Sequence, residues 1–137
     1  MKHTSLGGLD VSRTGLGTMS MSGYYLDPGS SESESIRTIH RALELGVTHI
    51  DTAEIYGPFA NEELVGRALN GRRDDVVVAT KFGLISHAGG GPGVIDSSPA
   101  NVRTAVEGSP SERLLGSPKD PIWFLSQLGK SRGPGTR

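Results

Sequence analysis

The sequence predicts an α/β fold in which right-handed β/α units build a parallel sheet. Strand-like and helix-like patterns alternate three times along the chain, from about Arg13 to about Val106. This strand–helix order favours parallel strands, and such crossovers are right-handed in nearly all proteins. Residues 76–79 are apolar at every position, as expected for a strand that helices cover on both faces.

A short β-hairpin and a glycine-containing strand come first. Residues 6–12 place turn glycines between apolar positions, which predicts a hairpin at the start of the chain. Residues 13–19 follow as a short strand whose glycines allow a ligand or another backbone to approach closely. Residues 20–30 contain glycines and a proline and are predicted to form a loop.

The first helix has signals at both of its ends. Ser31 with Glu34 three residues later is a capping-box signature, and apolar residues then recur at helical spacing. Gly46 is predicted to end this helix in a left-handed conformation. A short strand rich in β-branched residues follows at 47–51.

Two further helices are predicted from their capping residues. Asn61 is predicted to cap the second helix, which Gly71 ends. Ser98 followed by Pro99 is a favourable N-cap and first-turn pair for a third helix, which extends through Val106.

Composition argues against several classes of function. Fourteen basic and fifteen acidic residues leave a net charge of −1, so no field attracts nucleic acid or an anionic membrane. Cysteine is absent, and the four histidines are scattered without the pairing of a metal site. No apolar run approaches the roughly 20 residues of a membrane span, and no secretory signal is visible. We therefore expect a cytoplasmic protein with no metal, no nucleic-acid partner and no membrane.

Three side chains with acid–base chemistry fall at one rim of the predicted sheet. Asp51 and Lys81 each close a strand, and ligands bind at the carboxyl ends of parallel strands. Neighbouring strands lie about 4.8 Å apart, so the two side chains can form an ion pair. Tyr56 lies on the loop that follows Asp51, where a nearby ammonium group makes its hydroxyl a better proton donor. Such a cluster suits protonation of a carbonyl oxygen while a hydride reaches the carbonyl carbon.

Each of the three residues also has a purely structural interpretation. An aspartate at a strand end often caps the next helix, and a tyrosine before Gly-Pro often packs within a turn. A lysine after a buried strand often marks only where the chain meets water. The joint arrangement, rather than any single residue, favours a catalytic function.

Four blocks of sequence resemble consecutive landmarks of the aldo-keto reductases. These are residues 15–19, 51–57, 61–66 and 79–83, which occur in the family's order and spacing within a resemblance that covers about 5–107. The resemblance implies an incomplete (β/α)8 TIM barrel, comprising about the first three β/α units after a short β-hairpin. It also implies NADPH as the cofactor and a small-molecule carbonyl compound, an aldehyde or ketone, as the substrate.

The resemblance assigns roles to individual residues. Asp51, Tyr56 and Lys81 match three members of the family's catalytic tetrad, with Tyr56 as the general acid and the other two as its tuning pair. The residues that it implies for cofactor binding are Gly17, Thr18, Met19 and Asp51. The substrate wall would include Tyr56 and Tyr24, although ordinary packing within the loop is an equally good interpretation of Tyr24.

Residues 108–137 depart from the family pattern. The fourth tetrad member should be a histidine at the end of a fourth strand, but no histidine follows His87. This segment is rich in proline, glycine and serine, so we expect an irregular, non-family tail in which the apolar residues 122–125 have no partner. Because a full barrel needs about 250 residues, we also expect exposed sheet edges that promote self-association.

These departures bear on the expected activity. By descent the chain should be an NADPH-dependent reductase, impaired because the tetrad histidine and the late cofactor-binding loops are missing. One alternative is a non-catalytic binding or regulatory module. A second alternative is a non-functional fragment that arose by truncation or a frameshift.

Overall fold

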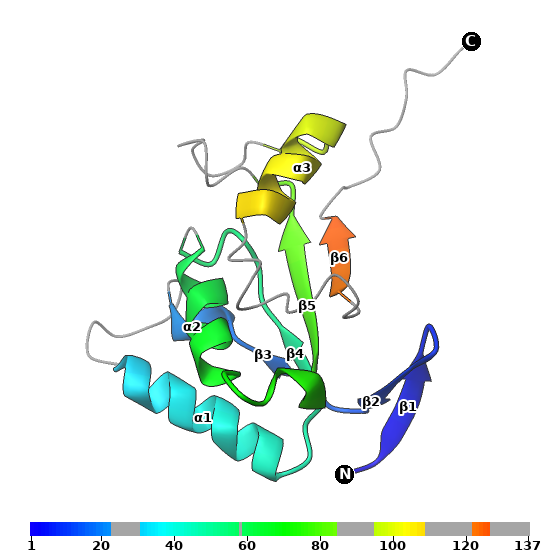
Figure 1. The fold of residues 1–137 in the computed structure, drawn as a ribbon, viewed down its shortest axis with the longest axis vertical. Helices are drawn as coiled ribbons and strands as arrows, with labels where there is room; N and C mark the ends of the chain where they lie inside the picture. The colour runs from blue at the N-terminus through cyan, green and yellow to red at the C-terminus, as the bar shows by residue number, and fades with distance from the viewer. Residues whose placement is uncertain (23–30, 58, 85–94, 109–121, 127–137) are drawn as a thin grey trace.

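The structure, a computed structural model, contains two sheets and three α-helices and describes residues 1–22, 31–57, 59–84, 95–108 and 122–126. An antiparallel hairpin formed by β1 (His3–Leu6) and β2 (Leu9–Ser12) precedes a parallel sheet (Figure 1). The sheet has the strand order β3-β4-β5-β6, and its strands are β3 (Leu16–Gly17), β4 (His49–Asp51), β5 (Val77–Phe82) and β6 (Ile122–Ser126). The α-helices are α1 (Glu32–Glu44), α2 (Ala60–Ala68) and α3 (Pro99–Gly108), and two short 3-10 helices are η1 (Met19–Met21) and η2 (Arg73–Asp75).

This arrangement confirms an α/β chain in which a hairpin precedes three β/α units. The strands that follow the hairpin are parallel, as their alternation with helices predicts. Within the described residues the sheet stays open and forms no closed barrel. In Figure 1, α1 and α2 lie side by side along the sheet, while α3 lies beyond the carboxyl end of β5.

The hairpin is fastened to the amino end of the sheet through Ser12 and Thr48. The backbone N–H of Ser12 donates to Thr48 Oγ1, and the N–H of Thr48 donates to Ser12 Oγ, both at 2.9 Å. The predicted hairpin is therefore confirmed, and it starts at His3, earlier than the turn glycines indicate. The following strand is shorter than predicted, because only Leu16 and Gly17 pair with β4 before the chain turns into η1.

The capping signals of α1 predict its start correctly. Ser31 is the N-cap, and its hydroxyl accepts a hydrogen bond from the N–H of Glu34 at 3.3 Å. The Glu34 carboxylate pairs with Arg37 on the surface of the same helix. Gly46 has φ +87°, the left-handed conformation expected beyond a helix end.

The start of α2 differs from the prediction. Phe59, in a left-handed conformation with φ 61°, is the N-cap, and no side chain caps this helix. Asn61, predicted as the cap, lies inside the first turn, where its side chain is fully buried. Tertiary hydrogen bonds to this amide override the usual preference of asparagine for the cap position.

One apolar core joins α1 and α2 to the sheet. Its members are buried residues from both helices and from β4, β5 and the segments beside them, namely Ile39, Ile50, Leu64, Val65, Ala68, Leu69, Val76 and Val78. Ile39, Ile50, Val65 and Leu69 have no exposed surface. This core packs β4 and β5, which carry two of the predicted catalytic residues, against α1 and α2.

The strand β6 lies in the segment expected to be irregular and without a partner. It pairs with β5 in parallel, with Val78 opposite Ile122 and Lys81 opposite Leu125. Its residues include Ile, Trp and Phe, which favour strands, and β5 would otherwise have an open edge. The sequence-based expectation of an irregular segment without a partner is therefore wrong for residues 122–126, which form a strand paired with β5.

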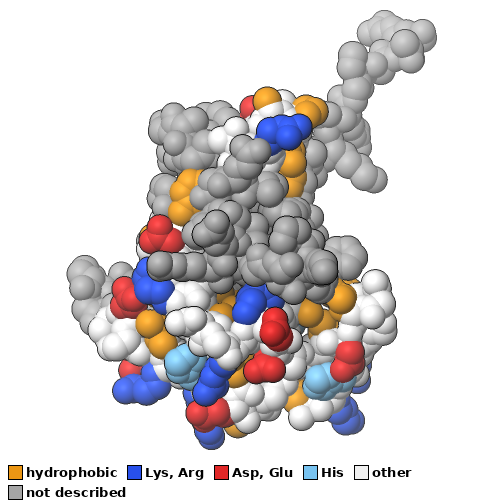
Figure 2. Space-filling view, in the orientation of Figure 1, with side chains coloured by type: hydrophobic (Ala, Val, Ile, Leu, Met, Phe, Trp, Pro, Cys, Tyr) orange, Lys and Arg blue, Asp and Glu red, His pale blue; other side chains and the backbone are white. Residues whose placement is uncertain are grey.

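Charged side chains of both signs are interspersed over the helices on the face drawn in Figure 2. The two helices carry ion pairs, including Arg41 with Glu44 within α1 and Arg67 of α2 with Glu32 of α1. Among the described residues, no helix combines the length and the apolar character that a membrane crossing requires.

Candidate active site

Parallel pairing of β4 and β5 brings Asp51 and Lys81 together. Asp51 is in register with Ala79, and Lys81 lies two residues further along the same face of β5. The Lys81 ammonium donates to Asp51 Oδ1 at 2.5 Å and to the backbone carbonyl of Thr52 at 2.8 Å. The Lys81 side chain is 13% exposed and that of Asp51 is 37% exposed. The structure therefore contains the ion pair that the sequence predicts at the sheet rim. Of its two partners, Lys81 is less exposed to solvent than Asp51.

Tyr56 approaches the same ammonium from the segment between β4 and α2. Lys81 Nζ lies 5.1 Å from the centroid of the Tyr56 ring, within the range of a cation–π contact. The backbone N–H of Tyr56 donates to the carbonyl of Ala53 at 3.1 Å, which fixes the turn that carries the ring. All three predicted catalytic residues thus meet at one place.

The predicted cofactor-binding residues Gly17, Thr18 and Met19 lie at the end of β3 and directly after it, next to Asp51 of β4. Gly17 is in register with Asp51, is exposed, and has nothing within 4 Å of the position that a Cβ would occupy. A flat group can therefore approach the backbone of Gly17 closely. Met19, which is half-buried, begins η1 immediately after this strand.

Thr18 lies beneath the rim, where it is fully buried. Its N–H donates to the Asp51 carbonyl at 3.0 Å, and its own carbonyl accepts from the N–H of Met21. Its hydroxyl lies 2.9 Å from the Asp51 carbonyl and 2.5 Å from Asn61 Oδ1. Thr18 therefore directs its polar groups into the protein, in contrast to the exposed Gly17.

Sequence reasoning missed the participation of Asn61 and Ser22 in this region. The Asn61 amide donates to Ser22 Oγ at 2.6 Å, and the Ser22 hydroxyl donates to the carbonyl of Tyr56 at 2.9 Å. The one available signal was an asparagine near a helix start, which local statistics assign to capping. Tyr24, the remaining predicted site residue, lies outside the described residues. Within the part of the chain that the structure describes, no group of three or more His, Asp or Glu side chains is arranged to hold a metal ion.

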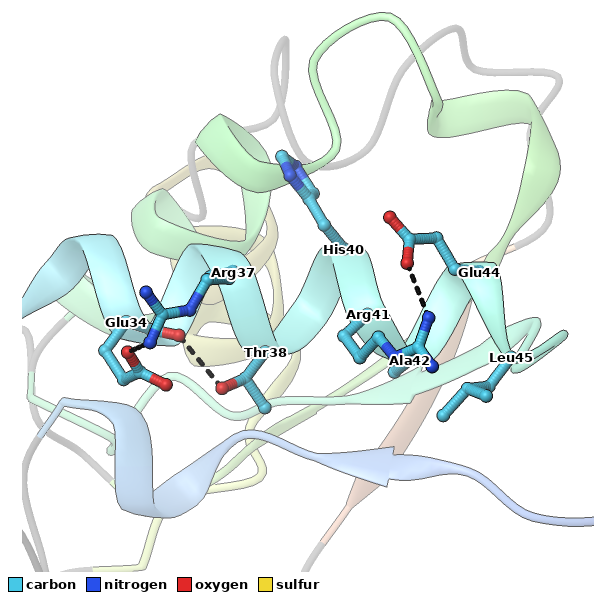
Figure 3. Close-up of a pocket in the computed structure, with 8 residues that line it drawn as sticks. All are labelled: Glu34, Arg37, Thr38, His40, Arg41, Ala42, Glu44 and Leu45. Atoms are coloured by element: carbon cyan, nitrogen blue, oxygen red, sulfur yellow. Dashed lines mark hydrogen bonds and ion pairs between the residues drawn. The ribbon is translucent and has the colours of Figure 1, made fainter.

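Two hollows lined by described residues differ in their relation to this cluster. A cavity bounded by Ala53, Ile55, Lys81, Phe82 and Leu84 has a volume of about 10 Å³, room for one water molecule at most. A groove of about 650 Å³ runs along α1 instead (Figure 3). Its charged residues pair with one another, and His40 points toward α2, where it contacts the Ala68 carbonyl at 2.8 Å. The groove shares no residue with the Asp51 cluster.

The cluster combines a proton donor with a sheltered positive charge. A phenol that loses its proton becomes an anion, and the adjacent Lys81 ammonium stabilises that anion. Asp51 holds the ammonium in place through the 2.5 Å contact. The arrangement is therefore suited to giving a proton to an oxygen atom that gains negative charge during a reaction.

Comparison with known proteins gives a consistent result. A model described as the aldo/keto reductase family matches residues 13–115, past the boundary at residue 107 expected from the sequence. The probable aldo-keto reductase 1 of Glycine max is 43% identical over 102 residues, which cover 73% of this chain and 29% of that protein. This chain therefore spans less than a third of the length of that relative.

Solved structures are similar over most of the chain. The holo form of the aldo-keto reductase AKR11C1 from Bacillus halodurans has a TM-score of 0.71 and 38% identity, covering 84% of this chain and 37% of that one. An aldo-keto reductase from Klebsiella pneumoniae, solved in complex with NADPH, has a TM-score of 0.56 and 28% identity. That match covers 77% of this chain and 32% of the other. These neighbours imply the (β/α)8 barrel as the fold of which this chain shows a part.

Proposed function

Because this chain belongs to the aldo/keto reductase family, we propose that its Asp51–Tyr56–Lys81 cluster reduces aldehydes or ketones to alcohols with NADPH. The observation that carries the proposal is the position of one ammonium group. Lys81 Nζ lies 2.5 Å from Asp51 Oδ1 and 5.1 Å from the Tyr56 ring centroid, so carboxylate, ammonium and phenol form one continuous group.

Tyr56 acts as the general acid in this proposal. Its hydroxyl gives a proton to the carbonyl oxygen, and Lys81 stabilises the phenolate that remains. The ammonium is well placed for this role because it is only 13% exposed, so water screens its charge weakly. Asp51 and the Thr52 carbonyl orient the ammonium through two hydrogen bonds.

In this proposal NADPH binds against the residues next to the cluster, and the exposure of Gly17 supports that position. Gly17 is exposed, lacks any neighbour near its Cβ position and is in register with Asp51, so a planar ring can lie against the backbone there. Met19 and Asp51 flank that position, while the buried Thr18 supports it from below. When bound, the nicotinamide supplies the hydride that the carbonyl carbon receives. NADPH is present in the similar structure from Klebsiella pneumoniae, which supports this choice of cofactor.

The test measures binding and turnover separately. Purified protein is titrated with NADPH while the cofactor fluorescence is followed, and NADPH oxidation is then measured with a panel of aldehydes and ketones. We expect saturable binding with turnover, and we expect Tyr56→Phe to keep the binding while the rate falls by about 10²–10⁴-fold. Full activity in Tyr56→Phe would show that the general acid is another group.

A binding or regulatory module remains the second candidate. Saturable NADPH binding without turnover of any tested carbonyl compound would favour this candidate. We place either activity in the cytoplasm, as the composition suggests, and fractionation of cells that express the chain would test this location.

A further inference from the structure

Asn61 lies in the first turn of α2 and has no exposed surface. Its amide nitrogen donates to the Thr18 carbonyl at 2.8 Å and to Ser22 Oγ at 2.6 Å. Its amide oxygen lies 2.5 Å from Thr18 Oγ1 and 2.7 Å from Thr52 Oγ1. A primary amide has two N–H donors and two lone pairs on oxygen, and each of these four faces a neighbour. The Thr18 hydroxyl shares its single proton between Asn61 Oδ1 and the Asp51 carbonyl.

The partners of this amide belong to the two segments that surround the proposed site. Thr18 and Ser22 lie after β3, on the proposed cofactor side, whereas Thr52 directly follows Asp51. The partners are 43, 39 and 9 residues away in sequence, so these bonds are almost entirely tertiary. Asn61 therefore joins the segment that would face the cofactor to the segment that carries the proton donor.

From these partners, further bonds reach Asp51 and Tyr56. The N–H of Thr18 donates to the Asp51 carbonyl at 3.0 Å, and the Ser22 hydroxyl donates to the Tyr56 carbonyl at 2.9 Å. The backbone N–H of Asn61 also donates to the Tyr56 carbonyl, at 3.2 Å. The backbone carbonyls of Asp51 and Tyr56 thus accept hydrogen bonds from Thr18 and Ser22, and both of these residues are hydrogen-bonded to the Asn61 side chain.

The two segments also touch directly at Gly57. This residue has φ +64°, and a Cβ added to it would lie 3.0 Å from the Ser22 carbonyl oxygen. Glycine is required there by both the conformation and the closeness of the other backbone. The Ser22–Tyr56 bond therefore lies within a tight contact, in which a small shift of either segment moves the other.

We propose that Asn61, acting through Ser22, is the positioning residue that sets where the Tyr56 phenol lies relative to the Lys81–Asp51 pair. It touches neither substrate nor cofactor. The expected effect of Asn61 on catalysis rests on the proposed function. The coupling of the two segments by Asn61 does not depend on that function. Misplacement of a catalytic group by about 1 Å can lower a rate by about 10²-fold, so such a residue has a large effect without contacting the reactants.

The chain offers a matched control in Asn101. This residue is also a buried asparagine in the first turn of a helix, at 7% exposure, and its amide donates to the Asp96 carbonyl at 2.7 Å. It lies in α3, and none of its hydrogen bonds within the described residues reaches Asp51, Tyr56 or Lys81. Asn101→Ala therefore removes a comparable buried amide without cutting the proposed coupling.

Hydrogen exchange on the full chain tests the coupling without any assay of activity. Asn61→Ala removes the four side-chain hydrogen bonds of the amide. Ser22→Ala removes only the two bonds of the Ser22 hydroxyl, to Asn61 and to the Tyr56 carbonyl, which protects the test if Asn61→Ala does not fold. We expect amide exchange in residues 16–22 and 51–57 to become about ten-fold faster in both variants, since each breaks the side-chain connection from Asn61 through Ser22 to Tyr56, a loss of at least about one net hydrogen bond. Ser22→Thr, which keeps the hydroxyl, should restore slow exchange. Exchange no faster than in Asn101→Ala would overturn the proposal.

Steady-state kinetics then test the effect on catalysis. In Ser22→Ala we expect kcat to fall by about ten-fold to a hundred-fold with little change in KM, and Ser22→Thr to recover most of the loss. Faster exchange together with an unchanged kcat would refute the positioning role. A wild-type protein without any turnover would instead refute the proposed function, and the exchange data alone would then decide whether Asn61 couples the two segments.

Discussion

Replacing Lys81 with methionine tests how strongly the central ion pair holds the two strands together. Methionine keeps most of the apolar stem and removes the ammonium, which makes two hydrogen bonds, to Asp51 Oδ1 and to the Thr52 carbonyl. Exposed ion pairs contribute about 0.2–1 kcal/mol, whereas removing one partner of a fully buried pair costs about 3–5 kcal/mol. With Lys81 at 13% and Asp51 at 37% exposure, the pair lies between these limits, because Asp51 regains water. We expect Lys81→Met to lower the free energy of unfolding by about 2 kcal/mol.

Urea denaturation of the wild type and the variant measures this loss as a shift in the unfolding midpoint at constant slope. Arg67→Met is the matched comparison, since Arg67 also joins two elements by a 2.8 Å ion pair with Glu32 but is 40% exposed. That variant should lose only about 0.5 kcal/mol, and added salt should shrink its effect more than that of Lys81→Met. Equal losses in the two variants would refute the reasoning, because they would show that burial adds nothing to the Lys81 pair.

Four further outcomes follow from the structure. Leu69→Ala, at a fully buried core position, should cost about 2–5 kcal/mol in urea denaturation, and a loss below 1 kcal/mol would contradict the core described here. Gly57→Ala should cost about 2 kcal/mol, because alanine disfavours φ +64° and its Cβ would lie 3.0 Å from the Ser22 carbonyl oxygen. Ser31→Ala should cost about 1 kcal/mol through loss of the α1 cap, checked by thermal unfolding followed by circular dichroism. Because β3 and β6 are the terminal strands of the described sheet, we also propose self-association, and a sedimentation coefficient that does not change with concentration would argue against it.

The elements best predicted from sequence are those whose signals are local. The cap at Ser31 and the left-handed Gly46 define α1, because both signals come from the backbone groups of the helix itself. The rim position of Asp51 and Lys81 follows from strand order, and the register of β4 with β5 then fixes their distance. The position of Tyr56 is predicted from its place on the segment after Asp51, and its ring centroid indeed lies 5.1 Å from Lys81 Nζ.

The features that the sequence did not reveal depend on distant partners. Asn61 has the local pattern of a helix cap, yet its amide bonds to residues 43 and 39 positions earlier in the chain. Thr18 was predicted together with Gly17 as one binding segment, although alternation of buried and exposed positions separates the two. The strand β6 depends on the edge that β5 presents, which no pattern within residues 122–126 can indicate.

Within the described residues, the bonds that build the proposed site join residues between 17 and 81. The Lys81 pair, the Tyr56 contact and the Asn61 amide all join β3, β4, β5 and the segments directly after them. These bonds fix the relative positions of Asp51, Tyr56 and Lys81 through residues of these units themselves. Cofactor affinity and substrate choice depend instead on the additional protein surface that contacts these molecules around the Asp51–Tyr56–Lys81 cluster. The geometry of the acid and the affinity for NADPH should therefore respond separately to mutation, with Ser22 affecting the first and Gly17 the second.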